Sequence, residues 1–431
     1  MNPNRIARLF AASAAAALAV APVAAQGTLT ARSLGTAGSW VADARGVDAL
    51  FFNPANLGLH NNPYWTTAMP QFALRTGFVG TRLGQVPSLF HFNKWSQGEK
   101  DAFVGGIPQQ GMNANLSITV PVAAIQYKRV AVGVSYTARY NENVGRDVVD
   151  LLVNGYQEGR TDYAVGNTSG RSASWLDFSA GTGRSFGKVS VGVAGHYIMG
   201  HAMAQHRLFE PEFNVEAQDL NAELREVAVR GGTGWGVDLG IAAEPAKRLT
   251  VSAAVANAFS GMRWSGDFRT KSLVLSKADF HKNAALEALD RFDASETAVD
   301  PSSVPVTVYE TARGLYDNAW LPATVRAGVA YSLPSEKTRL TASYQGALDE
   351  GSLDGGWRRR ISGGVEHTRG IISLRAGAGT DASGSYMLAT GFSAGPIQLG
   401  LARTSEPRES ARSSGWTFAF GLTARNLAVM P

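Results

Sequence analysis

The feature that most constrains this fold is an alternation of side-chain type that recurs along most of the chain. In the stretch VAVGVSY, which begins at Val130, valine or tyrosine occupies every second position and small or polar residues lie between them. A period of two is typical of β-strands with one apolar face and one polar or small face. The pattern predicts about fourteen strands, each about as long as a tilted strand must be to cross a membrane. They cover residues 63–79, 113–127, 130–140, 173–186, 188–200, 231–243, 248–258, 323–333, 338–348, 357–368, 370–380, 384–394, 396–404 and 414–424.

The connections between these strands are alternately short and long. Lys128-Arg129 and Gly187 are short links, whereas residues 80–112 and 259–322 are long ones. All the long connections therefore leave the same end of the sheet, as in outer-membrane barrels with short periplasmic turns and long external loops. A soluble β-sandwich or propeller is the alternative, but it gives no reason for so regular an alternation. We predict an all-β fold, a transmembrane antiparallel β-barrel of about fourteen strands with both chain ends on the periplasmic side.

The alternation also predicts which side chains face lipid. In the stretch that begins at Val130, we expect Val132, Val134 and Tyr136 to point outward. Gly133 and Ser135 are then expected to face the lumen, because successive side chains of a strand point to opposite faces.

The N-terminus has the pattern of a secretory signal peptide. Arg5 and Arg8 precede an apolar run from Leu9 to about Val20, and small residues follow. This run is too short for a retained membrane span, so we expect residues 1–25 to be removed. A buried N-terminal helix is the alternative interpretation. The chain has no cysteine, which argues against a lipoprotein anchor, disulfides and thiolate chemistry.

Composition excludes several other classes of protein. The net charge of +5 is modest for 431 residues, and the basic residues are dispersed, so no nucleic-acid partner is expected. After the N-terminal run, no stretch approaches the ~18 apolar residues of a transmembrane helix. The 48 glycines make up about 11% of the chain, which exceeds the usual ~7%.

An apolar stretch ahead of the first strand predicts a second structural part. Phe51 and Phe52 would be exposed in a loose tail, although burial of each ring is worth ~1.5–3 kcal/mol. Pro54 disfavours a helical conformation at Asn53, whose side chain can then close a turn on its own backbone. We therefore predict that the barrel begins at residue 63 and that residues 26–62 fold inside it as a hatch. The residues expected to form the folded centre of this hatch are Phe51, Phe52, Asn53, Pro54 and Ala55.

Several stretches carry a family resemblance. Residues 33–58, SLGTAGSWVADARGVDALFFNPANLG, resemble the N-terminal hatch of the long-chain fatty-acid transporter (FadL-like) superfamily, which holds an Asn-Pro-Ala step after a glycine-rich lead. Residues 255–264, 321–333 and 362–380 resemble later strand motifs of the same superfamily. The resemblance implies a fourteen-stranded outer-membrane barrel and is strongest to uncharacterised members of the superfamily.

The long connection 259–322 contains a predicted short helix. Ser276 and Asp279 have the spacing of a capping box, and an apolar-patterned stretch follows them. We expect this helix to lie outside the membrane and to offer an apolar surface where a ligand enters. Its apolar positions are Phe280, Leu286, Leu289 and Phe292.

Three consecutive arginines, Arg358, Arg359 and Arg360, fall at the external end of the tenth predicted strand. One interpretation is a solvated strand end. The other is contact with lipopolysaccharide phosphates, which arginine recognises well.

No catalytic, cofactor or metal site is predicted. Residues 391–395 match Gly-x-Ser-x-Gly, but this hydrolase motif needs a later histidine and the last one, His367, lies upstream. His196, His201 and His206 recur every five residues, which points neighbouring histidines to opposite faces of a strand.

The sequence favours a protein that is exported to a Gram-negative outer membrane. Its predicted function there is that of a passive channel for hydrophobic or amphipathic small molecules. The alternative is a barrel that binds protein partners, such as a secretion-system accessory or shuttle. An outer-membrane phospholipase or protease is a third class, but the sequence shows no Ser/His/Asp or Asp/His set for catalysis. The expected partners are membrane lipid, lipopolysaccharide, the barrel-assembly machinery and a hydrophobic ligand.

Overall fold

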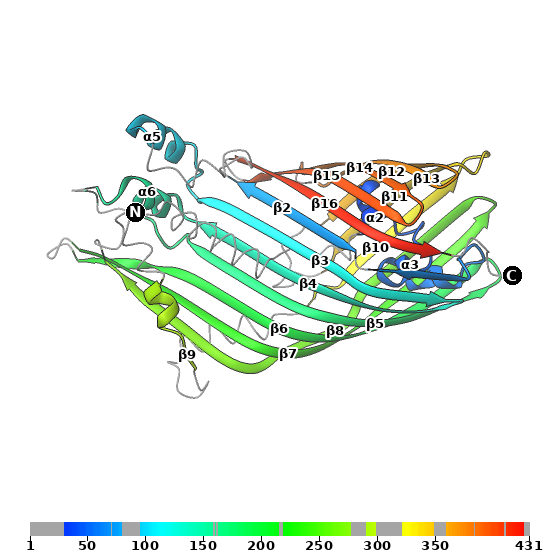
Figure 1. Cartoon of the computed structure of the whole chain (residues 1–431), viewed down its shortest axis with the longest axis horizontal. Helices are drawn as coiled ribbons and strands as arrows, with labels where there is room; N and C mark the ends of the chain where they lie inside the picture. The colour runs from blue at the N-terminus through cyan, green and yellow to red at the C-terminus, as the bar shows by residue number, and fades with distance from the viewer. Residues whose placement is uncertain are drawn as a thin grey trace.

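The predicted strands pair in chain order, each antiparallel to the next, and the first and last strands also pair (Figure 1). The computed structural model describes residues 30–69, 71–79, 95–157, 160, 163–214, 219–276, 290–298, 321–348, 359–382, 384–408 and 411–425. The predicted signal peptide lies outside these residues. The strands are β1 (Trp65–Ala68), β2 (Phe72–Val79), β3 (Met112–Tyr127), β4 (Val130–Val144), β5 (Ser169–Phe186), β6 (Val189–Asn214), β7 (Asp219–Ala246), β8 (Leu249–Leu275), β9 (Thr297–Ala298), β10 (Thr324–Ser332), β11 (Thr338–Ala347), β12 (Arg359–Arg369), β13 (Ile372–Thr380), β14 (Tyr386–Ala394), β15 (Ile397–Arg408) and β16 (Ala411–Arg425).

The wall of this barrel has fourteen positions. Of the sixteen strands, β1 and β2 share one position, because both pair with β3 on one side and β16 on the other. The two-residue β9 lies off the path and pairs with β8. The predicted number of strands is therefore confirmed, and the pairing of β16 with β1 and β2 closes the sheet.

The two faces of the wall differ as the alternation predicts. Val132 on β4 is exposed on the outer surface, whereas Ser135 is buried on the inner one. A Cβ on Gly133 would lie 3.0 Å from the ring of Phe51, which places this position toward the lumen. An outward surface of apolar side chains is what a lipid environment requires of a barrel. Among the described residues, no helix has both the length and the apolar character that a membrane crossing requires.

The strands are very unequal in length, which the sequence did not predict. Strands β6, β7 and β8 have 26, 28 and 27 residues, whereas β10, β13 and β14 have nine each. Most of the connection expected at 201–230, and the first part of the one expected at 259–322, are therefore paired strand. The long strands project beyond the rest of the wall at one end (Figure 1).

The strand extensions lack the lipid-facing pattern because their outer face is charged. His206 on β6 lies 3.0 Å from Glu142 on β4, and Lys271 on β8 lies 3.5 Å from Glu226 on β7. A strand whose outer side chains are ionic does not show apolar alternation, so it resembles a polar loop in the sequence.

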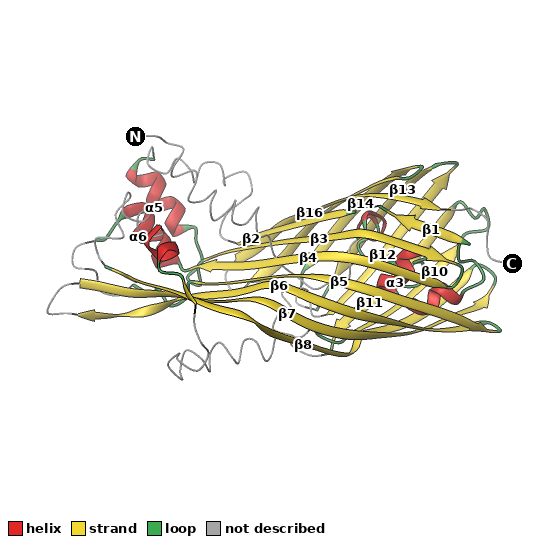
Figure 2. Cartoon of the chain, turned by 60° about the horizontal axis from the view of Figure 1, so that its bottom comes forward, coloured by secondary structure: helices red, strands yellow, loops and turns green. Residues whose placement is uncertain are grey.

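Two helices lie at the same end as these extensions (Figure 2). They are α5 (Gln97–Gly105) and α6 (Arg146–Asn154). A signal for α5 was present in the sequence, because Ser96 and Glu99 form a capping box at its start. Most of the helix predicted after Ser276 lies outside the described residues.

Candidate functional site in the barrel lumen

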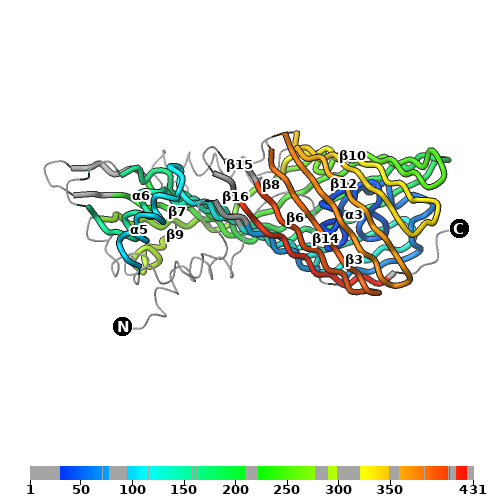
Figure 3. Tube along the Cα trace, turned by 90° about the horizontal axis from the view of Figure 1, so that it is seen from above, coloured from blue at the N-terminus to red at the C-terminus, as the bar shows by residue number. Residues whose placement is uncertain are grey.

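Residues 30–62, called here the lumen segment, fold inside the barrel at the end opposite α5 and α6 (Figure 3). The segment forms α2 (Ala31–Gly35), α3 (Val47–Phe52) and a 3-10 helix, η1 (Pro54–Gly58). Helix α2 contacts β13 to β16, whereas α3 and η1 contact β3 to β8 and β1. The segment therefore touches opposite sides of the wall.

The predicted turn at Asn53 is confirmed, and the Asn53 side chain also forms hydrogen bonds with the barrel wall that the sequence did not indicate. Its Oδ1 accepts a hydrogen bond from the Ala55 backbone N–H at 3.0 Å, which caps η1. Its Nδ2 donates to the carbonyl oxygens of Ile241 and Ala253 at 3.1 and 3.2 Å. These two residues are paired neighbours on β7 and β8, so one side chain ties the turn to two wall strands.

The glycine content of the chain is explained by close packing between the wall and the lumen segment. A Cβ on Gly183 would lie 2.6 Å from the Gly58 backbone nitrogen, and one on Gly400 would lie 2.7 Å from the Ala31 carbonyl oxygen. Such distances are too short for real carbon atoms, so only glycine allows the two backbones to approach this closely. Gly192, Gly377 and Gly391 are in the same situation, whereas Gly181, Gly240 and Gly364 closely approach side chains of the lumen segment.

Gly192→Ala is expected to loosen the lumen segment, whereas Gly195→Ala on the same strand is not. A Cβ at Gly192 would lie 2.5 Å from the Pro54 carbonyl oxygen, while one at Gly195 would meet nothing within 4 Å. Overpacking of this kind costs about 1–3 kcal/mol. Limited proteolysis of the purified barrel should cut the lumen segment faster in the first variant only. Equal cleavage in both variants would contradict this packing.

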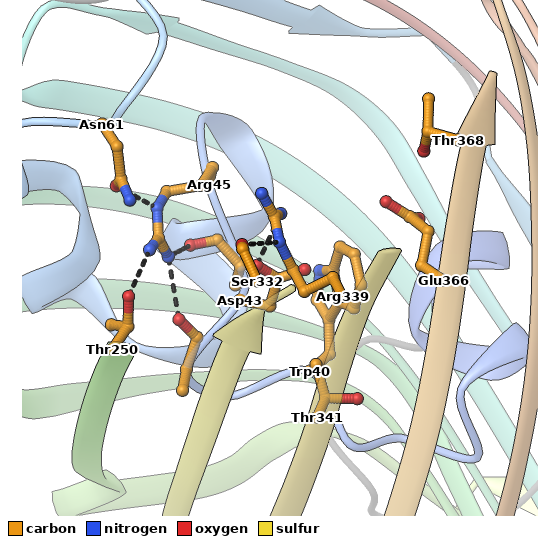
Figure 4. Close-up of polar contacts among 12 residues, drawn as sticks. Trp40, Asp43, Arg45, Asn61, Thr250, Ser332, Arg339, Thr341, Glu366 and Thr368 are labelled. Atoms are coloured by element: carbon orange, nitrogen blue, oxygen red, sulfur yellow. Dashed lines mark hydrogen bonds and ion pairs between the residues drawn. The ribbon is translucent and has the colours of Figure 1, made fainter. Parts of the chain in front are cut away.

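Polar contacts also connect the lumen segment to the wall (Figure 4). Arg339 on β11 donates to Asp43 at 2.7 Å, and Arg45 donates to Thr250 on β8 at 3.2 Å. Deeper inside, Arg326 on β10 donates to the Phe51 carbonyl oxygen at 2.8 Å. The buried backbone of the predicted hatch centre is thus satisfied by a wall guanidinium.

The inward positions of β6 show the order of layers along the lumen. The Ser190 hydroxyl donates to the Ala55 carbonyl oxygen at 2.7 Å, and Ala194 packs with the apolar residues of the lumen segment. His196 comes next, and Ile198 and Met203 follow it toward the extended end. The lumen segment, a polar layer and an apolar layer therefore succeed one another.

The polar layer is formed by three adjacent strands. His196 on β6 lies 3.0 Å from Asp177 on β5 and 3.3 Å from Asp238 on β7. Asp238 also accepts a hydrogen bond from the Asn257 backbone N–H at 2.7 Å. His201 faces outward as the alternation predicts, and His206 also faces outward because an irregularity in the β5–β6 pairing shifts the register beside His201.

The apolar layer, called here the lumen cluster, was not identified from the sequence. Its buried members are Ala173, Trp175, Ile198, Met203, Val229 and Trp264, and Val227, Met262, Phe268 and Leu321 pack against them. The guanidinium of Arg139 lies 4.7 Å from the ring centre of Trp175, a cation–π contact. Aromatic and thioether side chains of this kind make favourable contacts with apolar groups.

The residues of the predicted entry helix are not brought together with the lumen cluster. Phe280, Leu286 and Leu289 lie outside the described residues. Phe292 is buried, with the Lys271 ammonium 5.6 Å from its ring, beside the charged face of the β8 extension.

The three predicted arginines do not share one environment. Arg359 is exposed, and Arg358 lies outside the described residues. Arg360 is buried, with its Cζ 3.0 Å from the position of a Cβ on Gly38 in the lumen segment. The expected lipopolysaccharide contact is therefore wrong for Arg360, because the alternation turns this side chain inward.

Solved structures with a similar fold include two toluene transporters and a FadL homologue. The Ralstonia pickettii toluene transporter TbuX is 14% identical with a TM-score of 0.54, covering 92% of this chain and 98% of its own. The Pseudomonas putida toluene transporter TodX is 11% identical with a TM-score of 0.52, covering 93% and 98%. A Pseudomonas aeruginosa FadL homologue is 13% identical with a TM-score of 0.50, covering 94% and 100%.

Sequence comparisons are less informative than the fold. A model described as a family of unknown function (DUF5723) matches residues 208–402. No curated protein matches the sequence significantly. From its wall of fourteen strands and its structural neighbours, the chain has the fold of the FadL-like β-barrels.

Proposed function

We propose that this protein is a passive outer-membrane channel for hydrophobic small molecules. The observation that carries the proposal is the lumen cluster, an inward-facing group of aromatic, aliphatic and thioether side chains. In a wall whose lumen side is otherwise polar or small, such a cluster suits an apolar ligand rather than an ion or a sugar. The toluene transporters with the same fold support this class of substrate.

The order of layers along the lumen supports a route for the ligand. A molecule enters at the end where β6 to β8 extend and binds at the lumen cluster. It then passes the polar layer around His196 and the lumen segment, which acts as a hatch. The burial of the lumen segment and its contacts with opposite sides of the wall support this sealing role.

The cellular setting is part of the same proposal. An outward apolar surface and a FadL-like fold support a location in the outer membrane of a Gram-negative bacterium. Export by the signal peptide of residues 1–25, insertion by the barrel-assembly machinery, and contact of Arg359 with lipopolysaccharide complete this setting.

Uptake by cells tests the proposed function. Expression in a strain that lacks its own hydrocarbon channel should raise the uptake of toluene but not of a small sugar. Met203→Gln should lower this uptake several-fold, because it places an amide in the lumen cluster where Met203 is buried. Met199→Gln is the matched control, since Met199 is exposed on the outer face of the same strand.

No uptake above background, with the barrel present in the outer membrane, would overturn the channel proposal. Recovery of a stoichiometric secreted protein with the purified barrel would favour the protein-binding alternative instead.

A further inference from the structure

Trp264 in the lumen cluster carries a buried hydrogen-bond donor without an acceptor. The side chain is 4% exposed, and its indole Nε1 has no hydrogen-bond partner in the described part of the chain. The indole nitrogen is a donor only, and buried tryptophans usually direct it to a partner. A donor left unpaired in a buried position is costly and requires an explanation.

The packing of the indole ring fixes where this donor points. A Cβ on Gly200 would lie 2.6 Å from Cζ3 of Trp264, and one on Gly232 would lie 3.0 Å from Cε3. These two carbons belong to the edge of the indole opposite Nε1. The wall glycines therefore hold the carbon edge of the ring, and the N–H points away from them.

The apolar side chains around Trp264 do not supply an acceptor for its indole N–H. Those that pack with Trp264 in the lumen cluster are aliphatic, aromatic or thioether groups. Among them, a methionine sulfur is at most a weak acceptor. The site thus combines a large apolar surface with the Trp264 donor, and the Arg139 guanidinium lies on the ring of Trp175 beside it.

We propose that the lumen cluster binds an apolar molecule that bears a hydrogen-bond acceptor, such as a ketone, ester or ether oxygen. The acceptor oxygen takes the Trp264 indole N–H, and the hydrocarbon part packs on Met203, Val229 and Met262. This inference rests on the proposed function and narrows its substrate class. A pure hydrocarbon leaves the donor unpaired, whereas a polyol brings more polar groups than the cluster can satisfy.

A pair of ligands with nearly the same shape tests the inference. Acetophenone and ethylbenzene differ in one oxygen, and their binding to the purified full-length barrel can be measured by partitioning, with empty micelles subtracted. The wild-type protein should prefer acetophenone by about three- to tenfold, the range expected for one neutral hydrogen bond. Trp264→Phe should reverse the preference in favour of ethylbenzene, because the ketone oxygen is then buried without a donor to replace its water.

Trp175→Phe is the matched control, because Trp175 belongs to the same cluster. It should change both affinities by a similar factor and leave their ratio intact. Binding of both ligands without a preference in the wild-type protein would overturn the inference and leave the channel proposal standing. Binding of neither ligand would overturn both. The wild-type ratio decides the question even if Trp264→Phe fails to fold.

Discussion

A barrel from which residues 26–60 are deleted is expected to fold and to admit small solutes that the intact protein excludes. The wall closes through strand pairs that begin at β1, so the hydrogen-bonded ladder does not require the lumen segment. The segment fills the lumen with large side chains that are fully buried, among them Trp40, Leu50 and Leu57. Their removal leaves a passage lined by the inward-facing glycines and polar residues of the wall.

The deletion is also expected to lower the stability of the barrel. Each large apolar side chain that loses its burial is worth ~1.5–3 kcal/mol, so several kcal/mol are lost in total. The shift in electrophoretic mobility on heating reports folding, and swelling of liposomes in small sugars reports permeability. Heat modification should persist at a lower transition temperature, with a faster rate of swelling.

Deletion of α5, residues 97–105, is the control, because this helix lies at the opposite end of the barrel from the lumen segment (Figure 1). It should leave the rate of swelling unchanged. Loss of the barrel on deletion of residues 26–60 would mean that the segment is needed for wall assembly. A folded barrel with unchanged permeability would mean that the lumen is closed elsewhere.

The strands of the wall were predictable because their signal is local. Alternation along β4 reveals its two faces without reference to any other part of the chain, and all fourteen wall positions were found in this way. The same signal fails in the extensions of β6, β7 and β8. There the outer face carries His206, Glu226 and Lys271, and irregular pairing near Gly231 shifts the register.

The contents of the lumen were predictable only in part. The Asn53 turn follows from an Asn-Pro step, but its bonds to Ile241 and Ala253 join residues about 200 positions apart. Trp264 lies in a stretch that was expected to be a loop. Its packing with Trp175 in the lumen cluster could therefore not be predicted from the sequence. An apolar side chain on the inner face of a strand has the same local pattern as one that faces lipid.

A disulfide between the lumen segment and the wall is expected to abolish uptake. The hydroxyl oxygens of Ser39 and Thr341 lie 2.7 Å apart, one on the lumen segment and one on β11. Cysteines at these positions fall within the short reach of a disulfide. Because the natural chain has no cysteine, Ser39→Cys with Thr341→Cys introduces one defined bond. Oxidation should stop uptake of toluene, and a reductant should restore it.

The control for this experiment joins two wall strands with the same chemistry. The hydroxyl oxygens of Thr368 on β12 and Ser373 on β13 lie 2.9 Å apart. A disulfide here leaves the lumen segment free, so uptake should be the same under oxidising and reducing conditions. The two double variants therefore separate fixation of the lumen segment from a general effect of cross-linking the barrel.

The effect of the Ser39–Thr341 disulfide on uptake depends on which contacts must break during transport. Near Ser39, the segment is held by non-covalent contacts, among them the ion pair of Asp43 with Arg339 and the close packing of Ser39 against Gly364. A covalent bond at Ser39 keeps these contacts from separating, while the packing of η1 against the wall glycines is unchanged. Continued uptake with the Ser39–Thr341 disulfide formed would mean that the ligand leaves the lumen without displacing this part of the segment, and the role of the segment as a hatch would then be wrong.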